Sequence, residues 1–96
     1  MVFAVTLLRI ENLDSGMRNV AIEGKVVNMN PWMLVIEDES GQAFVRYRQR
    51  NLKTPVVIGD RVKIKNARTV NWSGILQLKL DSNGEVAAVG RPGTTD

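Results

Sequence analysis

The chain has 96 residues, of which 44% are hydrophobic and 24% are charged, so it can form one hydrophobic core and differs in composition from disordered proteins. It contains no cysteine and no histidine, which excludes disulfides, thiolate zinc sites and the Cys-His or Ser-His pairs of common hydrolases. The formal net charge is only +3, yet eight basic residues lie between Arg46 and Arg68 against the single acid Asp60. Such a segment suits an anionic partner, which is either a phosphate backbone or an anionic membrane surface.

The start of the chain predicts neither a signal peptide nor a membrane span. Its apolar stretch has no preceding basic residue and no small-residue cleavage site. No apolar run approaches the roughly 20 residues that cross a bilayer. We therefore expect a cytoplasmic protein. Asp14, Ser15 and Gly16 form a turn signal, so the residues before them are predicted to be a short lead-in that covers one end of the domain.

The first two strands are predicted at residues 20–28 and 32–36. In the first, Val20, Ile22 and Val26 share one face, which is the pattern of a half-buried strand. Gly24 in its middle indicates either a bend at a barrel corner or a close approach of two backbones. A short connection that ends at Pro31 makes the two strands a hairpin.

A third strand is predicted beyond a turn at residues 37–41. Its inner positions are apolar and include Tyr47, whereas its outer positions are Phe44, Arg46 and Arg48. The three consecutive carboxylates at residues 37–39 diverge on a turn, so we do not expect them to bind a metal ion. Residues 49–58 have no helical spacing of apolar side chains, which predicts an irregular connector without a long helix.

The second half of the chain predicts the remaining strands. The stretch RVKIKNAR at residues 61–68 is a fourth strand, followed by a polar loop at residues 69–73. Residues 74–80 place leucines on one face, and a turn at residues 81–84 leads to a last short strand near residues 85–89. The chain is thus one all-β domain over residues 1–90, a barrel or a sandwich, with a flexible tail at residues 91–96.

Four stretches of the sequence carry a resemblance: IENLDSGMRNVAIEGKVV, EDESGQAFVRY, IGDRVKIKNA and WSGILQL. In this order, and at nearly this spacing, they resemble the single OB domains of archaeal and human-type single-stranded DNA-binding proteins, which belong with replication protein A. The resemblance implies a five-stranded OB-fold barrel. It also implies binding of single-stranded DNA with little sequence preference, in replication and repair, without a cofactor.

The family stacks bases on aromatic side chains, whose places in this sequence are Arg48, Arg68 and Trp72. Trp72 alone keeps a ring, so part of the stacking is exchanged for charge, since a guanidinium can both stack on a base and contact phosphate. The expected binding residues therefore combine cations with rings: Phe44, Arg46, Arg48, Lys63, Lys65, Arg68, Trp72 and, as the weakest candidate, Trp32. The alternative is that the cations form a solvated strand face and that each tryptophan packs over a barrel end.

We expect no enzyme, because the sequence has neither a nucleophile with a base nor a phosphate-cradling glycine loop. Two alternatives to DNA binding fit the same residues. An OB domain that has lost stacking residues can serve as a scaffold or a protein-interaction subunit of a replication-protein-A-like complex. An OB domain of this charge can also bind RNA, because contacts to the 2′-hydroxyl leave no sequence motif.

Overall fold

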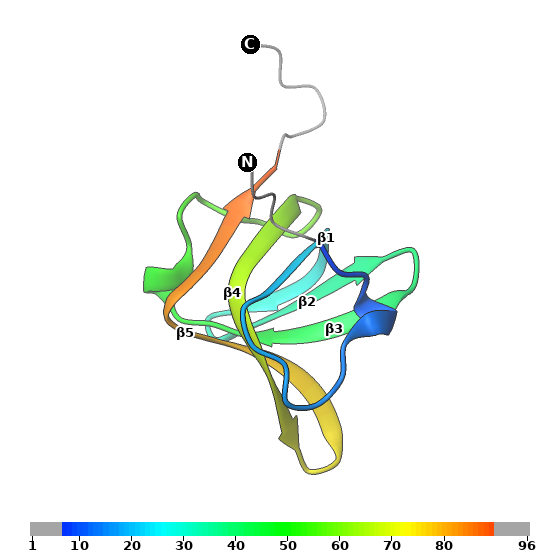
Figure 1. Cartoon of the computed structure of the whole chain (residues 1–96). Coiled ribbons are helices and arrows are strands. Elements are labelled where there is room, and N and C mark those ends of the chain that lie inside the picture. Colours follow the sequence, from blue (N-terminus) through cyan, green and yellow to red (C-terminus); the bar gives the residue numbers. More distant parts are fainter. Residues whose placement is uncertain (1–6, 90–96) are drawn as a thin grey trace, which may run out of the picture.

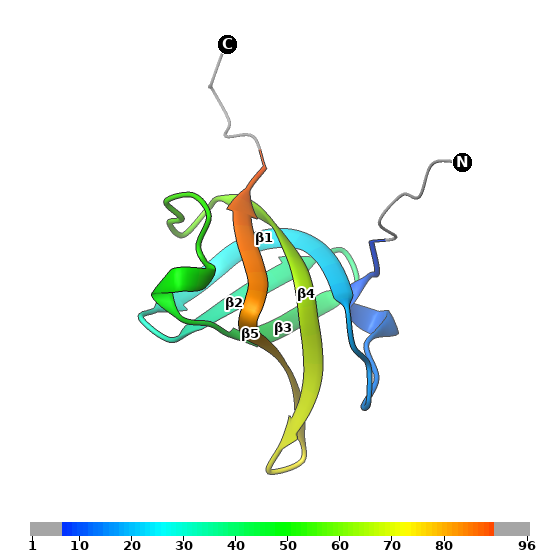
Figure 2. The same ribbon diagram turned by 60° about the vertical axis from the view of Figure 1, so that its left-hand side comes forward.

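The computed structural model describes residues 7–89, which form a closed β-barrel. Around the barrel the strands follow the order β1-β2-β3-β5-β4, and only β3 and β5 are parallel neighbours. The elements are the strands β1 (Val20–Asn30), β2 (Met33–Asp38), β3 (Gly41–Arg46), β4 (Arg61–Trp72) and β5 (Ile75–Ala88) and the 3-10 helices η1 (Ile10–Asn12) and η2 (Gln49–Asn51) (Figures 1 and 2). Because neither helix in this part of the chain exceeds three residues, the prediction of a five-stranded barrel without a long helix is confirmed.

Apolar side chains that alternate along the strands fill the barrel, as the sequence predicts. Burial of a valine, leucine or isoleucine side chain contributes about 1.5–3 kcal/mol relative to exposure, so this interior dominates the stability of the fold. The predicted inner residue Tyr47 is buried, which raises the pKa of its hydroxyl. That hydroxyl donates a 2.6 Å hydrogen bond to the carbonyl oxygen of Asn30. The completely buried aliphatic residues are Ile22, Val26, Leu34, Ile36, Val45, Val62, Ile64, Ala67, Leu78 and Val86.

Strand β1 pairs with β4 along its first half and with β2 along its second half, and Gly24 lies near the change of partner. A Cβ atom at Gly24 would lie 2.8 Å from the carbonyl oxygen of Glu37 in β2. Only a residue without a side chain permits this contact between backbones. The structure therefore confirms the close approach that the glycine indicates.

The lead-in packs against the barrel core and is fixed there by Asp38 at the end of β2. Ile10 is buried, and Leu8, Leu13 and Met17 pack against the core. The amide of Ile10 donates a 2.8 Å hydrogen bond to Oδ2 of Asp38, and the hydroxyl of Ser40 donates one of 2.6 Å to Oδ1. One carboxylate thus joins η1 to the turn between β2 and β3.

Substitution Asp38→Asn should lower the free energy of unfolding at neutral pH and make it less dependent on pH in the acidic range. Burial raises the pKa of this carboxyl, but hydrogen bonds from Ser40, Ile10 and Gly41 outweigh it, so the pKa lies below the ordinary value of 3.8. A folded-state pKa below the unfolded value stabilises the protein above the unfolded pKa, and this contribution is lost as the pH falls through the folded pKa. Urea unfolding of both proteins between about pH 7 and pH 2 measures the difference. If the free energy of unfolding falls equally with pH in both proteins, the lowered pKa of Asp38 is contradicted.

The predicted polar loop at residues 69–73 is wrong, because β4 continues to Trp72. Residues 69–72 pair one by one with β5, and the turn is formed by Ser73 and Gly74 alone, with φ values of 50° and 83°. Two consecutive residues with positive φ are typical of a tight hairpin turn that follows the twist of the strands. The resulting β4–β5 hairpin extends well beyond the barrel (Figures 1 and 2). Long-range pairing therefore overrides the polar composition of this stretch.

The predicted turn at residues 81–84 is also wrong, since β5 runs through it as a bent strand. Lys65 pairs with Glu85 and Ala67 with Leu80, so one residue of β4 faces four residues of β5. The buried side chain of Asn51 fills the bend and donates hydrogen bonds of 2.8 and 2.9 Å to the carbonyl oxygens of Asp81 and Gly84. Turn-forming residues thus produce an irregularity within one strand instead of separating two strands.

Two further expectations concern the ends of the chain. The flexible tail predicted at residues 91–96 lies outside the described residues. Between residues 7 and 89, the structure contains no helix whose length and apolar character would let it cross a membrane.

Candidate nucleic-acid interface

Three cationic side chains form a row across the outer face of β3, β5 and β4. Arg46 of β3 is the register partner of Lys79 in β5, and Lys79 is in turn the partner of Arg68 in β4. Residues directly opposite in neighbouring strands project to the same face of a sheet. We call Arg46, Lys79 and Arg68 the cationic row.

Trp72 lies against the end of this row. It is the last residue of β4, its side chain is 57% exposed, and the guanidinium carbon of Arg46 lies 4.6 Å from the centroid of its ring. This is the geometry of a cation–π contact, which holds the ring and the charge together. Arg46 covers one face of the indole, and the exposed remainder is available to a further planar group. Trp72 is therefore not a plug of the barrel end.

Phe44 extends the same surface along β3. It precedes Arg46 by two residues and is 40% exposed, so its predicted outer orientation is confirmed.

Two buried polar atoms on this surface have no hydrogen-bond partner among the described residues. On β5, next to β3, Gln77 is buried, and one of these atoms is its Oε1. Nε of Arg46 is likewise buried without a partner there. The charge of Arg46 is thus positioned by packing against Trp72 and is not neutralised by a carboxylate.

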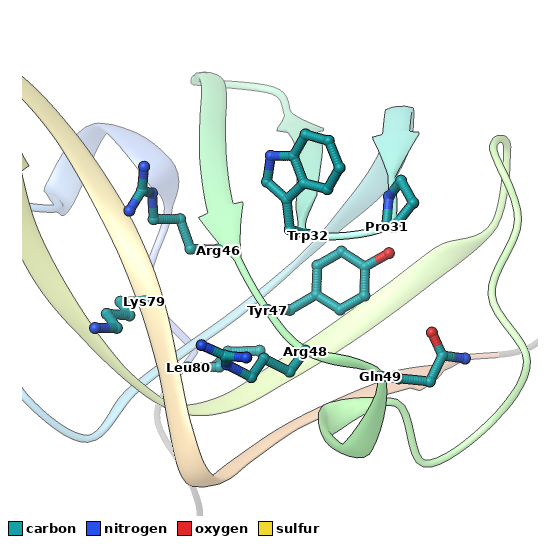
Figure 3. A pocket seen from close by; sticks show the side chains of 8 residues that line it. All are labelled: Pro31, Trp32, Arg46, Tyr47, Arg48, Gln49, Lys79 and Leu80. Atoms are coloured by element: carbon teal, nitrogen blue, oxygen red, sulfur yellow. The ribbon is translucent and has the colours of Figure 1, made fainter.

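A pocket of about 430 Å³ adjoins the row at the end of β3 (Figure 3). The two-residue turn between β1 and β2 forms one wall with Trp32, which is 63% exposed and therefore does not pack over a barrel end. Oδ1 of Asn30 accepts hydrogen bonds from the amides of Trp32 and Met33, at 3.0 and 2.8 Å, and fixes this turn. No carboxylate lines the pocket, whose residues are Pro31, Trp32, Arg46, Tyr47, Arg48, Gln49, Lys79 and Leu80.

Arg68 belongs to the row but is engaged by an acid. Its Nε atom lies 2.7 Å from Oδ2 of Asp81, and a second guanidinium nitrogen lies 3.4 Å from Oδ1. This hydrogen bond lowers the pKa of Asp81 and raises the pKa of Arg68. Both side chains are substantially exposed, so the pair is solvent-screened and can exchange for another anion.

The structure places Lys63 and Lys65 apart from the other predicted binding residues. They lie on the part of β4 before its irregularity, where Lys63 is the partner of Glu23 in β1 and Lys65 the partner of Glu85 in β5. Glu23 also forms an ion pair of 2.6 Å with Arg61. Each of the two lysines therefore has an acidic neighbour across the sheet. Of the predicted residues, the structure brings together Phe44, Arg46, Arg68 and Trp72 on one surface and Arg48 with Trp32 in the adjoining pocket.

Lys79 is the main site residue that sequence reasoning missed. Its alternation with Leu78 and Leu80 places it outside, and this signal was present in the sequence. Its position between Arg46 and Arg68 depends on the parallel pairing of β3 with β5, which no local pattern reveals. Gln49 was missed for a similar reason, because η2 brings it to the pocket from the connector. No group of three metal-binding side chains occurs in the part of the chain that the structure describes.

The fold and this surface define the class: the chain is an OB-fold domain whose outer β3–β5–β4 face carries a row of cations beside exposed aromatic rings. Similarity to solved structures supports the fold. An OB domain from Thermoplasma acidophilum matches with a TM-score of 0.70 at 17% identity, over 94% of this chain and 92% of the other. The replication factor A related protein from Methanobacterium thermoautotrophicum matches with a TM-score of 0.74 at 17% identity, over 88% and 91%.

A third similar structure comes from a larger protein. A murine DNA-binding protein, solved bound to double-stranded DNA, matches with a TM-score of 0.63 at 19% identity, over 93% of this chain and 51% of the other. No family model and no curated protein matches the sequence. At these identities the comparisons establish the OB fold.

Proposed function

We propose that this OB domain binds single-stranded DNA with little sequence preference and has no catalytic activity. The observation that carries the proposal is the contact of Arg46 with Trp72 at one end of the cationic row. It places a positive charge and an exposed stacking ring close enough for both to contact the same nucleotide. Single-strand-binding OB folds combine these two features, a cationic groove for the backbone and rings for the bases.

In this proposal the phosphates contact the cations and the bases stack on the rings. Lys79 and Arg46 have no ion pair among the described residues, so they supply charge without breaking a salt bridge. The accessible face of Trp72 and the exposed ring of Phe44 offer two stacking positions. Stacking accepts any base, so contacts of this kind predict little sequence preference. Lys63 and Lys65 contribute only through the longer-range field.

The similar structures support a nucleic-acid ligand in general, without distinguishing single-stranded DNA from other nucleic acids. One is named as related to replication factor A, and another is a DNA-binding protein solved with double-stranded DNA. These names belong to those proteins, and the charge and aromatic pattern of this chain is the independent reason to propose the same class of ligand.

Tryptophan fluorescence during titration with a short oligothymidine tests the proposal. Stacking on Trp72 or Trp32 should quench the emission, and the logarithm of the binding constant should fall by about 0.7 per contacted phosphate for each unit of log salt concentration. Competition with an oligouridine of equal length distinguishes DNA from RNA. Absence of binding at low salt, by fluorescence and by an independent method, would overturn the proposal.

Substitution Asp81→Ala should strengthen binding about 2- to 5-fold at low salt, because it frees Arg68 for phosphate and removes a negative charge from the surface. The salt dependence should become steeper by roughly one phosphate contact. Glu85→Ala removes the same charge beside Lys65, away from the row, and is the matched control. Equal gains from both substitutions would attribute the effect to net charge instead of to Arg68.

A second candidate function is binding of a protein partner, and a separate surface favours it. Val57 and Ile58, in the connector before β4, are 57% and 59% exposed and do not line the pocket. Exposed neighbouring aliphatic residues of this kind are typical of contact surfaces when they form a patch. If the domain serves mainly as a scaffold, substitution of both residues by serine should abolish partner capture and leave oligothymidine titrations unchanged.

A further inference from the structure

We propose that the pocket beside Trp32 binds the phosphorylated end of a strand, that is, a terminal nucleotide whose phosphate is a monoester. This inference rests on the proposed function and adds a specific ligand for one end of the binding surface. It is carried by the charge of the pocket, by its position at the limit of the sheet and by the exposed ring in its wall.

The charge of the pocket exceeds what one internal phosphate requires. Arg46, Arg48 and Lys79 all line it, no carboxylate does, and none of the three has an ion pair among residues 7–89. In Figure 3 the guanidinium group of Arg46 points away from the ends of Arg48 and Lys79, so all three cations line the pocket from different directions. An internal phosphodiester carries one negative charge, whereas a phosphate monoester carries about 1.5 to 2 near neutral pH. Three cations in the lining of one pocket therefore match the terminal group better.

The pocket lies where the sheet surface ends. Strand β3 ends at Arg46, and the chain leaves the sheet through Tyr47 and Arg48 toward η2. The turn that carries Pro31 and Trp32 closes the other side. Arg46 both contacts Trp72 and lines the pocket, so the stacking ring and the pocket adjoin. A strand that follows this surface thus meets the three cations at its end.

The pocket also fits a nucleotide in size. Its volume of about 430 Å³ falls within the range of about 300 to 1,000 Å³ that is typical of small-ligand sites. Trp32 is 63% exposed at its edge and offers a stacking surface for the terminal base. The amide side chain of Gln49 adds an uncharged hydrogen-bonding group.

The test compares oligothymidines of about eight nucleotides, a length within the site sizes of OB folds. One carries a 5′-phosphate, one a 3′-phosphate, and the control is one nucleotide longer without a terminal phosphate, so that the number of phosphates is equal. We expect one of the two phosphorylated oligomers, the one whose end reaches the pocket, to bind about 5- to 10-fold more tightly than the control. Arg48→Ala should reduce this preference to less than about 2-fold. Arg50→Ala, an exposed substitution of equal charge outside the pocket lining, should retain it.

Equal affinity for all three oligomers would overturn this inference and leave the proposed function intact. Equal loss of the preference in Arg48→Ala and Arg50→Ala would also overturn it, because net charge would then be the cause. If neither the phosphorylated oligomers nor the unphosphorylated control binds at all, the proposed function itself is wrong. Titration with thymidine monophosphate separates a strand end from a free nucleotide, since only the strand end also contacts Trp72.

Discussion

Substitution Trp72→Ala should weaken oligothymidine binding by about 10-fold or more and remove most of the fluorescence quenching. Loss of a stacked base costs about 1–3 kcal/mol, and each 1.4 kcal/mol is a factor of ten in affinity. The substitution also removes the ring that holds the guanidinium of Arg46, 4.6 Å from its centroid. Arg46 then has to be ordered by the ligand, which adds to the loss. Titration by fluorescence anisotropy with a labelled oligomer measures the effect independently of tryptophan.

Two control variants separate stacking from general damage to the hairpin. Ile75 is the register partner of Trp72 and is 51% exposed, so Ile75→Ala truncates an apolar side chain at the same level of the β4–β5 hairpin. It should change the affinity by less than about 3-fold. Trp72→Phe should restore part of the binding, since phenylalanine keeps a stacking face. A loss for Ile75→Ala as large as that for Trp72→Ala would show that hairpin conformation, not the indole, determines binding.

Substitution Asn51→Ala should lower the free energy of unfolding by about 3 kcal/mol, which corresponds to a melting temperature roughly 12 to 24 °C lower. Asn51 is completely buried. Its amide donates to the carbonyl oxygens of Asp81 and Gly84, and its Oδ1 accepts a 2.8 Å hydrogen bond from the amide of Arg48. Alanine removes all three hydrogen bonds, of which the one to Gly84 is buried and the other two are partly buried, and an unpaired buried polar group costs about 1–3 kcal/mol.

Urea unfolding with a matched control measures this effect. Asn71→Ala removes the same side chain from an exposed position on β4 and should change stability by less than about 0.5 kcal/mol. The Asn51 variant should also lose part of its affinity for oligothymidine, because Arg48 and Gln49 flank the pocket and depend on η2 for their position. Similar stability of the two variants would mean that water replaces the contacts of Asn51 and that the bend in β5 forms without it.

The sequence by itself determined the class of fold and the inner and outer positions of most strands. Side chains alternate with a period of two in any strand, so the inner position of Tyr47 and the outer positions of Phe44 and Arg46 could be predicted without knowing which strands are neighbours. The close approach at Gly24 could be anticipated for a similar reason, since the absence of a side chain is itself a local signal. The basic segment between Arg46 and Arg68 favoured an anionic partner, which stays a prediction.

Only the tertiary structure decided which of these residues lie together on one surface. Parallel pairing of β3 with β5 brings Lys79 between Arg46 and Arg68, although the strands are far apart in the chain and no local pattern encodes their contact. The irregularity in β4 and β5 separates Lys63 and Lys65 from Arg68 on the surface, although all three residues belong to the same strand. Pairing between strands also converted residues 69–72 of a predicted loop and a predicted turn at residues 81–84 into parts of β4 and β5, because hydrogen bonds across the sheet and the side chain of Asn51 outweigh local turn preferences.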